Sequence, residues 1–152
     1  MKTAKTLLML MLLSIGQVTV SDEPDSEQIV TEVMAVLDAF MAGFSASSPQ
    51  QHTATYHFPH FRLARGEILV WETQEQALAA HEELFQQLPE TGWHRSDWLE
   101  REVISVSDTK VHVATRFARY REDGSELTRA ESLYVLIRED GRWGVKLRSS
   151  FL

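Results

Sequence analysis

The chain contains no cysteine among its 152 residues. Disulfide bonds, thiolate nucleophiles and cysteine-ligated zinc sites are therefore excluded. A glycine-rich loop of the kind that holds nucleotide phosphates is also missing. Acidic residues outnumber basic ones, and the net charge of -7 makes nucleic acid or an anionic membrane surface an unfavourable partner. We therefore expect a protein that works without a cofactor and without a nucleic-acid partner.

The N-terminal segment is apolar and begins with positive charge. Lys2 and Lys5 precede a nearly uninterrupted apolar run over residues 6–15. This pattern is typical of a secretory signal peptide, and the run is too short for a comfortable membrane span. The alternative is an uncleaved membrane tether. We expect residues 1–21 to be the signal peptide and residues 22–152 to form one domain, periplasmic or secreted, with no membrane attachment after cleavage.

Apolar periodicity and capping residues predict three helices. A long amphipathic helix is expected over about 26–45, where apolar residues recur at three- and four-residue intervals. Ser48 caps a short second helix, with Pro49 at its first helical position. Thr73 caps a third helix, which Pro89 stops.

The chain after the third helix is typical of strands. Asp-Gly pairs at 123–124 and 140–141 each separate two strand-like runs, and Asp-Gly is a strong signal for a two-residue hairpin turn. A weaker turn is expected at 107–110. Residues 57–72 are predicted to form a hairpin at a sheet edge, because Pro59 lacks the amide that a central strand needs. The sequence therefore predicts an α+β fold, with three helices packed on a curved, mostly antiparallel sheet.

The Asp-Gly turns also predict which residues lie opposite one another. Counting back from them, Thr115 faces Ser132, which faces Ser149. Tyr134 and Arg119 share this predominantly apolar side, which is therefore the side beneath the helices. Buried hydroxyls and a buried arginine need partners. A small-molecule cavity would provide them; the alternative is that the hydroxyls bond nearby backbone and Arg119 reaches solvent.

The strand that precedes the weaker turn has a less certain register. A two-residue turn at 107–110 puts Glu102 opposite Thr115. The same register puts Trp98 opposite Arg119. A β-bulge in this strand would reverse the assignment.

The order of elements resembles that of the nuclear transport factor 2-like superfamily, which includes SnoaL-like domains. The resemblance covers about residues 26–152 and is carried by the segments YHFPHFRLARG, RYREDG and DGRWGVKLRSSF. It implies a cone-shaped fold with a pocket between the helices and the concave sheet, and a homodimer formed through the outer sheet. Relatives include isomerases, cyclases, epoxide hydrolases and non-catalytic binding domains, so the fold does not decide the function.

The histidines have no clear catalytic or metal-binding pattern. Two residues separate His57 from His60, but Pro59 disrupts the usual metal-binding geometry and no third ligand is evident, so we expect no metal site. On an alternating strand they face opposite sides, and His60 with Arg62 is predicted at the cavity rim, although His57 is the alternative. His81 is expected in the core. The remaining histidines are expected at the surface: His52, His94 and His112.

The leading interpretation is an exported, cofactor-free domain that binds a small, mostly apolar molecule with a polar or anionic group. The expected ligand-binding residues are Arg119, Thr115, Ser132, Tyr134, Ser149, Glu102, Trp98, His60 and Arg62. One alternative is a cofactor-independent isomerase or hydrolase that uses Glu102 as general base, alone or with His60. Another is a dimeric interaction module with a vestigial cavity. A homodimer is expected through outer-face residues His112, Ala114, Ala118, Leu133 and Val135.

Overall fold

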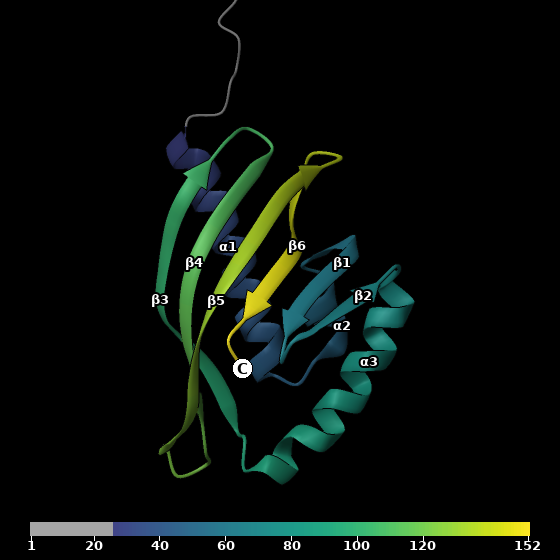
Figure 1. Cartoon of the computed structure of the whole chain (residues 1–152), viewed down its shortest axis with the longest axis vertical. Coiled ribbons are helices and arrows are strands. Elements are labelled where there is room, and N and C mark those ends of the chain that lie inside the picture. The colour runs from purple at the N-terminus through teal and green to yellow at the C-terminus, as the bar shows by residue number, and fades with distance from the viewer. Residues whose placement is uncertain (1–25) are drawn as a thin grey trace, which may run out of the picture.

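The computed structural model of the protein describes residues 26–152 (Figure 1). The predicted signal peptide, residues 1–21, lies outside the described residues. The elements in chain order are α1 (Ser26–Ser45), α2 (Pro49–Thr53), β1 (Tyr56–Ala64), β2 (Glu67–Trp71), α3 (Gln74–Gln87), the 3-10 turn η1 (Leu88–Thr91), β3 (Arg95–Val106), β4 (Lys110–Tyr120), β5 (Glu126–Glu139) and β6 (Arg142–Ser150).

The strands form one six-stranded sheet in the order β2-β1-β6-β5-β4-β3. Neighbouring strands are antiparallel except β1 and β6, which run parallel. Figure 1 shows α1 crossing behind the long strands, and α3 standing beside the β1–β2 end. The predicted α+β class, with helices packed on a curved and mostly antiparallel sheet, is confirmed.

The core lies between α1 and the inner face of the sheet. By length and composition α1 would pass as a membrane span, but its apolar stripe is buried within the fold, as in the core helix of a globular domain. Burying each large apolar side chain contributes about 1.5–3 kcal/mol. The principal cluster contains Ile29, Val33, Leu37, Phe40, Tyr56, Ala77, Val111, Val113, Tyr134, Leu136, Trp143 and Val145.

The short helices begin at the predicted caps. The Ser48 hydroxyl accepts from the Gln51 amide at 3.3 Å, and the Thr73 hydroxyl accepts from the Gln76 amide at 3.4 Å. Each cap satisfies an amide that the first turn leaves without a helical partner. Gly92 follows η1 with φ of 84°, a left-handed conformation that glycine adopts without strain.

The hairpin predicted over residues 57–72 is present at one edge of the sheet, which β2 forms. The expectation that Pro59 avoids a central strand is wrong, because Pro59 lies in β1, between β2 and β6. The strand tolerates it because pairing with β6 is interrupted between Tyr56 and Phe61, and pairing with β2 begins only at His60. Pro59 thus falls where its missing amide breaks no ladder.

The predicted register holds between β4 and β5 and fails within β6. Thr115 lies opposite Ser132, as expected. In β6 the pairing shifts after Val145, so that Ser150, and not Ser149, lies opposite Ser132. The extra residue at this bulge moves every later side chain of β6 to the other face.

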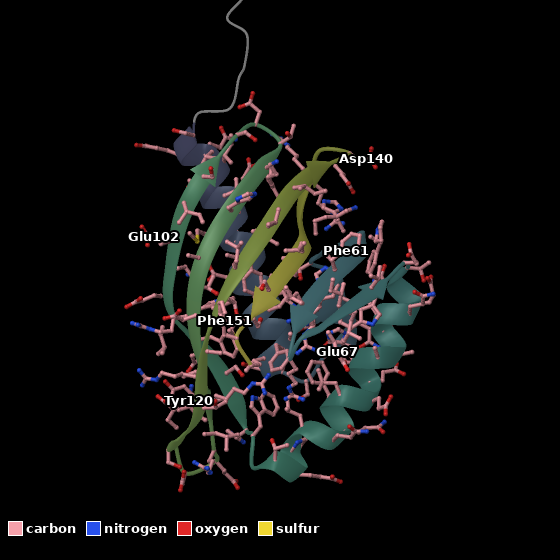
Figure 2. All side chains as sticks on the ribbon, viewed as in Figure 1. Phe61, Glu67, Glu102, Tyr120, Asp140 and Phe151 are labelled. Atoms are coloured by element: carbon pink, nitrogen blue, oxygen red, sulfur yellow. The ribbon has the colours of Figure 1, made fainter. Side chains whose placement is uncertain are left out.

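Two bulges also shift β3. Trp98 lies opposite Phe117 instead of Arg119, and Glu102 lies opposite Ala114 instead of Thr115. Glu102 is exposed, and Figure 2 shows it at the outside of β3. The prediction that Glu102 faces the cavity is therefore wrong, for the reason that a bulge reverses the facing of a strand.

Candidate functional site

A cavity of about 240 Å³ lies between α1, the inner face of the sheet and the end of α3. Most of its wall is apolar: Phe40, Met41, Phe44, Leu84, Leu88, Phe117 and Leu152. Neutral polar side chains complete it: Gln87, Thr91, Ser96, Tyr134 and Ser150. Apolar walls with a few polar groups are typical of small-molecule sites.

Among residues 26–152, four arginines line this cavity, and no aspartate or glutamate side chain does. Arg62 comes from β1, Arg65 from the turn that follows it, Arg119 from β4 and Arg148 from β6. Arg62 and Arg148 are register partners across the parallel β1–β6 pair. Three separate strands thus direct positive charge into one small space.

Arg148 is the most deeply buried of the four, with 7% of its surface exposed. Its guanidinium carbon lies 5.3 Å from the centre of the Phe40 ring. Arg119 lies over Phe44 and Phe117, at 5.8 and 5.9 Å from their ring centres. Such cation–π contacts recover only part of the hydration that a buried guanidinium loses.

The arginines have no anionic partner among residues 26–152. No ion pair involves Arg62, Arg119 or Arg148, and the buried Nε atom of each makes no hydrogen bond. Burial lowers the pKa of Arg62 to about 10, and nearby Arg148 lowers it further. Burial, followed by Arg148, also lowers the pKa of Arg119. Both guanidinium groups remain charged at neutral pH.

Three of the predicted ligand-binding residues line the cavity: Arg119, Tyr134 and Arg62. Thr115 and Ser132 are buried beyond it, where Thr115 donates to the Ser132 carbonyl at 3.3 Å. The Ser132 and Ser150 hydroxyls lie 2.9 Å apart, so a hydroxyl row exists with Ser150 in the place predicted for Ser149.

Trp98 and His60 belong to the core and do not line the cavity. The Trp98 indole donates to the Leu37 carbonyl at 3.1 Å. His60 Nδ1 donates to the Val145 carbonyl at 2.8 Å. Glu102 lies on the outer face because the bulge between Val103 and Ser105 reverses its direction.

Sequence reasoning missed Arg148, which regular alternation after the second Asp-Gly turn places on the outer face. The bulge within β6 turns it inward, opposite Tyr134. Arg65 was missed because it lies in the β1–β2 turn. The prediction of Arg62 at the cavity rim was the only sign of positive charge here. Arg148 lies beside Arg62 because the two are register partners in the parallel β1–β6 pair.

Comparison with protein families matches residues 31–147 to the family described as NTF2-like protein (DUF6841). The chain belongs to this NTF2-like family. The predicted superfamily resemblance is thereby confirmed. Comparison with curated proteins gives no match.

Solved structures show the same fold at low sequence identity. An NTF-2 like protein of unknown function from Shewanella oneidensis MR-1 is similar with a TM-score of 0.67 and 13% identity, covering 82% of this chain and 99% of that one. A protein from Catenulispora acidiphila in complex with S-DNPA has a TM-score of 0.66 and 16% identity, covering 82% and 93%. A ketosteroid isomerase-like protein from Erwinia carotovora atroseptica has a TM-score of 0.60 and 17% identity, covering 80% and 93%.

Beside the cavity, this NTF2-like protein buries a histidine–tyrosine network formed by His52, Tyr56 and His81. His52 Nδ1 donates to the Phe40 carbonyl at 2.9 Å, and His81 Nδ1 donates to the Ala77 carbonyl at 2.7 Å. The Tyr56 hydroxyl lies 2.8 Å from His52 Nε2 and 3.2 Å from His81 Nε2. Both Nε2 atoms are acceptors in neutral rings, and one hydroxyl has one hydrogen to donate. Tyr56 therefore donates to His52 and leaves His81 Nε2 without a donor.

The histidines in and beside this network are held neutral by their surroundings. Burial, then Arg148, lowers the pKa of His81 to about 4 and that of His60 to about 3. The same two causes lower the pKa of His52. His81 is in the core as predicted, whereas the prediction that His52 lies at the surface is wrong, because α2 packs it against Phe40 and Phe44.

His57 contacts a different face of the β1–β6 region from His60. Its Nε2 donates to the Arg142 carbonyl at 2.9 Å, and it packs so closely on Gly144 that a Cβ there would lie 2.5 Å from the ring. Within the described residues, no three histidine or carboxylate side chains gather as metal ligands.

Proposed function

We propose that this NTF2-like protein is an exported domain that binds a small, mostly apolar molecule with an anionic group. The observation that supports this proposal is a cavity lined by four arginines and, among the described residues, by no aspartate or glutamate side chain. Export is proposed from the signal peptide pattern of the N-terminal segment.

The energetics of burial favour an anionic ligand. A desolvated charge is costly unless it is paired. Burial, and after it repulsion from Arg148, lowers the pKa of Arg62 and of Arg119. A bound anion would offset this repulsion, and guanidinium groups bind carboxylates and phosphates through paired hydrogen bonds.

The residues proposed as bases for an isomerase or hydrolase, Glu102 and His60, do not line the cavity. Glu102 is exposed on the outer face, and His60 lies outside the cavity lining. Burial, opposed in part by Arg148, raises the pKa of Tyr134, so this hydroxyl also stays protonated. Because no aspartate, glutamate or histidine side chain of the described residues lines the cavity, binding is the better supported function.

The names of two similar structures do not decide between binding and catalysis. The Catenulispora acidiphila protein was solved in complex with S-DNPA, and the Erwinia protein is named as ketosteroid isomerase-like. At such low identity they share only the fold with this chain.

The test is native mass spectrometry of the mature protein with whatever small molecules co-purify. We expect an anionic molecule on the wild type and on Arg129→Leu, a control whose guanidinium pairs with Glu126 at the surface. Arg119→Leu should remain folded and lose the molecule. A neutral or cationic molecule, or an Arg119→Leu protein that still retains its anion, would contradict the proposal.

We also propose that a second copy of the chain covers the outer face of the sheet. Its apolar residues are aligned by register across neighbouring strands: Leu63 with Ile68, Phe61 with Val70 and Leu147, and Val135 with Leu147. His112 lies opposite Val135 in the same row. Ile68 is 70% exposed and Leu63 is 42% exposed. Contiguous exposed apolar surface of this kind is typical of an interface.

Sedimentation equilibrium at micromolar concentration tests this assembly. The wild type and Glu82→Lys, which changes an exposed position on α3, should be dimers. Ile68→Lys should be a monomer. A wild-type monomer at every concentration would exclude the dimer and leave the ligand proposal untouched.

A further inference from the structure

We propose that Ser96 is a ligand-binding residue, and that its hydroxyl group donates a hydrogen bond to the same anionic group that Arg119 binds. This inference rests on the proposed function. It names a second donor at the site and the class of the anionic group, which is an oxyanion such as a carboxylate. Ser96 is not among the ligand-binding residues expected from the sequence.

Ser96 and Arg119 lie side by side in the wall of the cavity. They are register partners in the antiparallel β3–β4 pair, and both line the cavity. Residues directly opposite each other in such a pair have Cβ atoms about 4.5–5.5 Å apart. Both also lie near Phe44, because the guanidinium carbon of Arg119 is 5.8 Å from the centre of that ring, and the backbone of Ser96 is hydrogen-bonded to Ser45, the next residue of α1. One small group at this end of the cavity can therefore contact both side chains.

The indole of Trp93 determines how the Ser96 hydroxyl group is used. Trp93 Nε1 donates to Ser96 Oγ at 2.9 Å, and an indole nitrogen can only donate. The hydroxyl oxygen is therefore the acceptor of this bond, and its own hydrogen remains for another partner. Among the described residues, none of the side-chain hydrogen bonds of Ser96 uses that hydrogen. Because Ser96 is only 1% exposed, its hydroxyl group is a buried donor without an acceptor in its own chain.

Together, the two side chains favour a group that only accepts hydrogen bonds. A guanidinium group has no acceptor atom, and one of the two lone pairs of Ser96 Oγ is already used by Trp93. This end of the cavity thus offers mainly donors, which suit the oxygen atoms of an oxyanion. Hydrogen bonds to a charged acceptor are about twice as strong as those to a neutral one. Ser96 should therefore distinguish an oxyanion from an uncharged group of the same shape.

The indole N–H resonances report on this contact in the wild-type protein. Benzoate is the probe, because a cavity of about 150 Å³ is sufficient for benzene and the volume here is about 240 Å³. Nitrobenzene has the same shape without the charge and is the matched control. A hydrogen bond from Ser96 to benzoate would polarise the bond that Ser96 accepts from Trp93.

In proton–nitrogen correlation spectra, we expect the Trp93 indole proton to move downfield with benzoate and clearly less with nitrobenzene. The Trp143 indole, which donates to Glu32 at 3.1 Å, should keep its position with both probes. Trp93→Phe identifies the resonance by removing it. The same titrations give the affinity of the wild type for each probe.

Removing the hydroxyl group measures its contribution to affinity. Ser96→Ala alone would leave the Trp93 indole without its acceptor, so the comparison is made in a Trp93→Phe background, where that donor is absent. The double variant should bind benzoate at least about tenfold more weakly than Trp93→Phe does, and nitrobenzene within about twofold. Ser105→Ala, which changes an exposed serine of the same strand, should match the wild type. Circular dichroism and the unfolding midpoint would establish that each variant is folded.

The outcomes separate the two proposals. If benzoate binds the wild type no more tightly than nitrobenzene does, the proposed anion-binding function fails, and the role of Ser96 fails with it. If benzoate is preferred but the Trp93 resonance moves equally with both probes, the anion site remains and Ser96 is not part of it. The same conclusion follows if the folded double variant binds benzoate as tightly as Trp93→Phe does.

Discussion

Two groups of polar side chains lie beneath the same sheet and differ in how they are compensated. In the histidine–tyrosine network, the imidazoles donate to the carbonyls of Phe40 and Ala77 within the fold. In the cavity, Arg62 and Arg119 have no ion-pair partner among the described residues. The imidazoles of the network thus have hydrogen-bond partners in their own chain. The arginines of the cavity lack an anionic partner and are available to a bound anion. The difference separates polar residues that maintain the fold from polar residues that are available to a ligand.

The largest expected effect is a loss of stability at mildly acidic pH. His60 and His81 have folded pKa values of about 3 and about 4, below the value of about 6.5 expected in the unfolded chain. Between these values the unfolded state binds more protons, so the free energy of unfolding falls as pH falls from about 6.5 toward 4. Each buried histidine contributes up to about 1.4 kcal/mol per pH unit.

Urea denaturation at several pH values between 7 and 4.5 measures this dependence. His94→Gln, which changes an exposed histidine, should follow the wild-type curve. A free energy of unfolding that stays constant from pH 6.5 to 5 would show that the network does not hold its histidines neutral.

Tyr56→Phe removes the only hydroxyl between His52 and His81. The His52 Nε2 acceptor would lose its donor inside the core, and we expect a loss of about 1–3 kcal/mol in the free energy of unfolding. Tyr120→Phe, a partly exposed tyrosine, is the control and should change stability by less than about 0.5 kcal/mol. Equal values for the two variants would mean that the network contributes nothing measurable.

Arg148→Met should raise the free energy of unfolding, whereas Tyr56→Phe should lower it. It removes a buried charge without an ion-pair partner while keeping most of the side-chain volume, so the ligand-free protein should gain about 1–2 kcal/mol. The control is Arg142→Met, because Arg142 donates to the Tyr56 carbonyl at 2.8 Å and its replacement should destabilise the protein. Chemical denaturation of both variants, with ligand removed, makes the comparison. If Arg148→Met destabilises the protein, then Arg148 stabilises the fold and is not held in reserve for a ligand.

Arg65→Gln should have the smallest effect. Arg65 lies at the exposed mouth of the cavity, where solvent screens its charge. We expect a change in stability of less than about 0.5 kcal/mol and a loss of affinity for the co-purifying anion of only about two- to fivefold. A loss as large as that for Arg119→Leu would place the anionic group of the ligand at the rim of the cavity instead of in its interior.

Much of the architecture could be predicted because its signals are local. Ser48 and Thr73 cap their helices through contacts within one turn, and the Asp-Gly turn sets the β4–β5 register that brings Thr115 opposite Ser132. The burial of His52 had no such signal. It depends on the close approach of α2 to α1, where a Cβ at Gly43 would lie 2.6 Å from the His52 amide.

The candidate site was harder to predict because it depends on bulges. The interruption of pairing between Val103 and Ser105 turns Glu102 outward, and one in β6 turns Arg148 inward. A bulge inserts one residue into the alternation and leaves little trace in composition. The sequence therefore predicted that arginine and hydroxyl groups face the helices, but it assigned several of them to the wrong positions.

The charge of the cavity wall formed by β6 depends on the bulge, because the bulge decides which side chains of this strand face inward. Lys146 points away and donates to the Phe58 carbonyl at 2.9 Å, while Arg148 and Ser150 line the cavity. If the same residues paired without the bulge, Leu147 and Ser149 would take those positions and this wall would be neutral. A relative with the same residues in this strand but no bulge would then accept a ligand of different charge, and the difference would be visible in its strand pairing and not in its sequence.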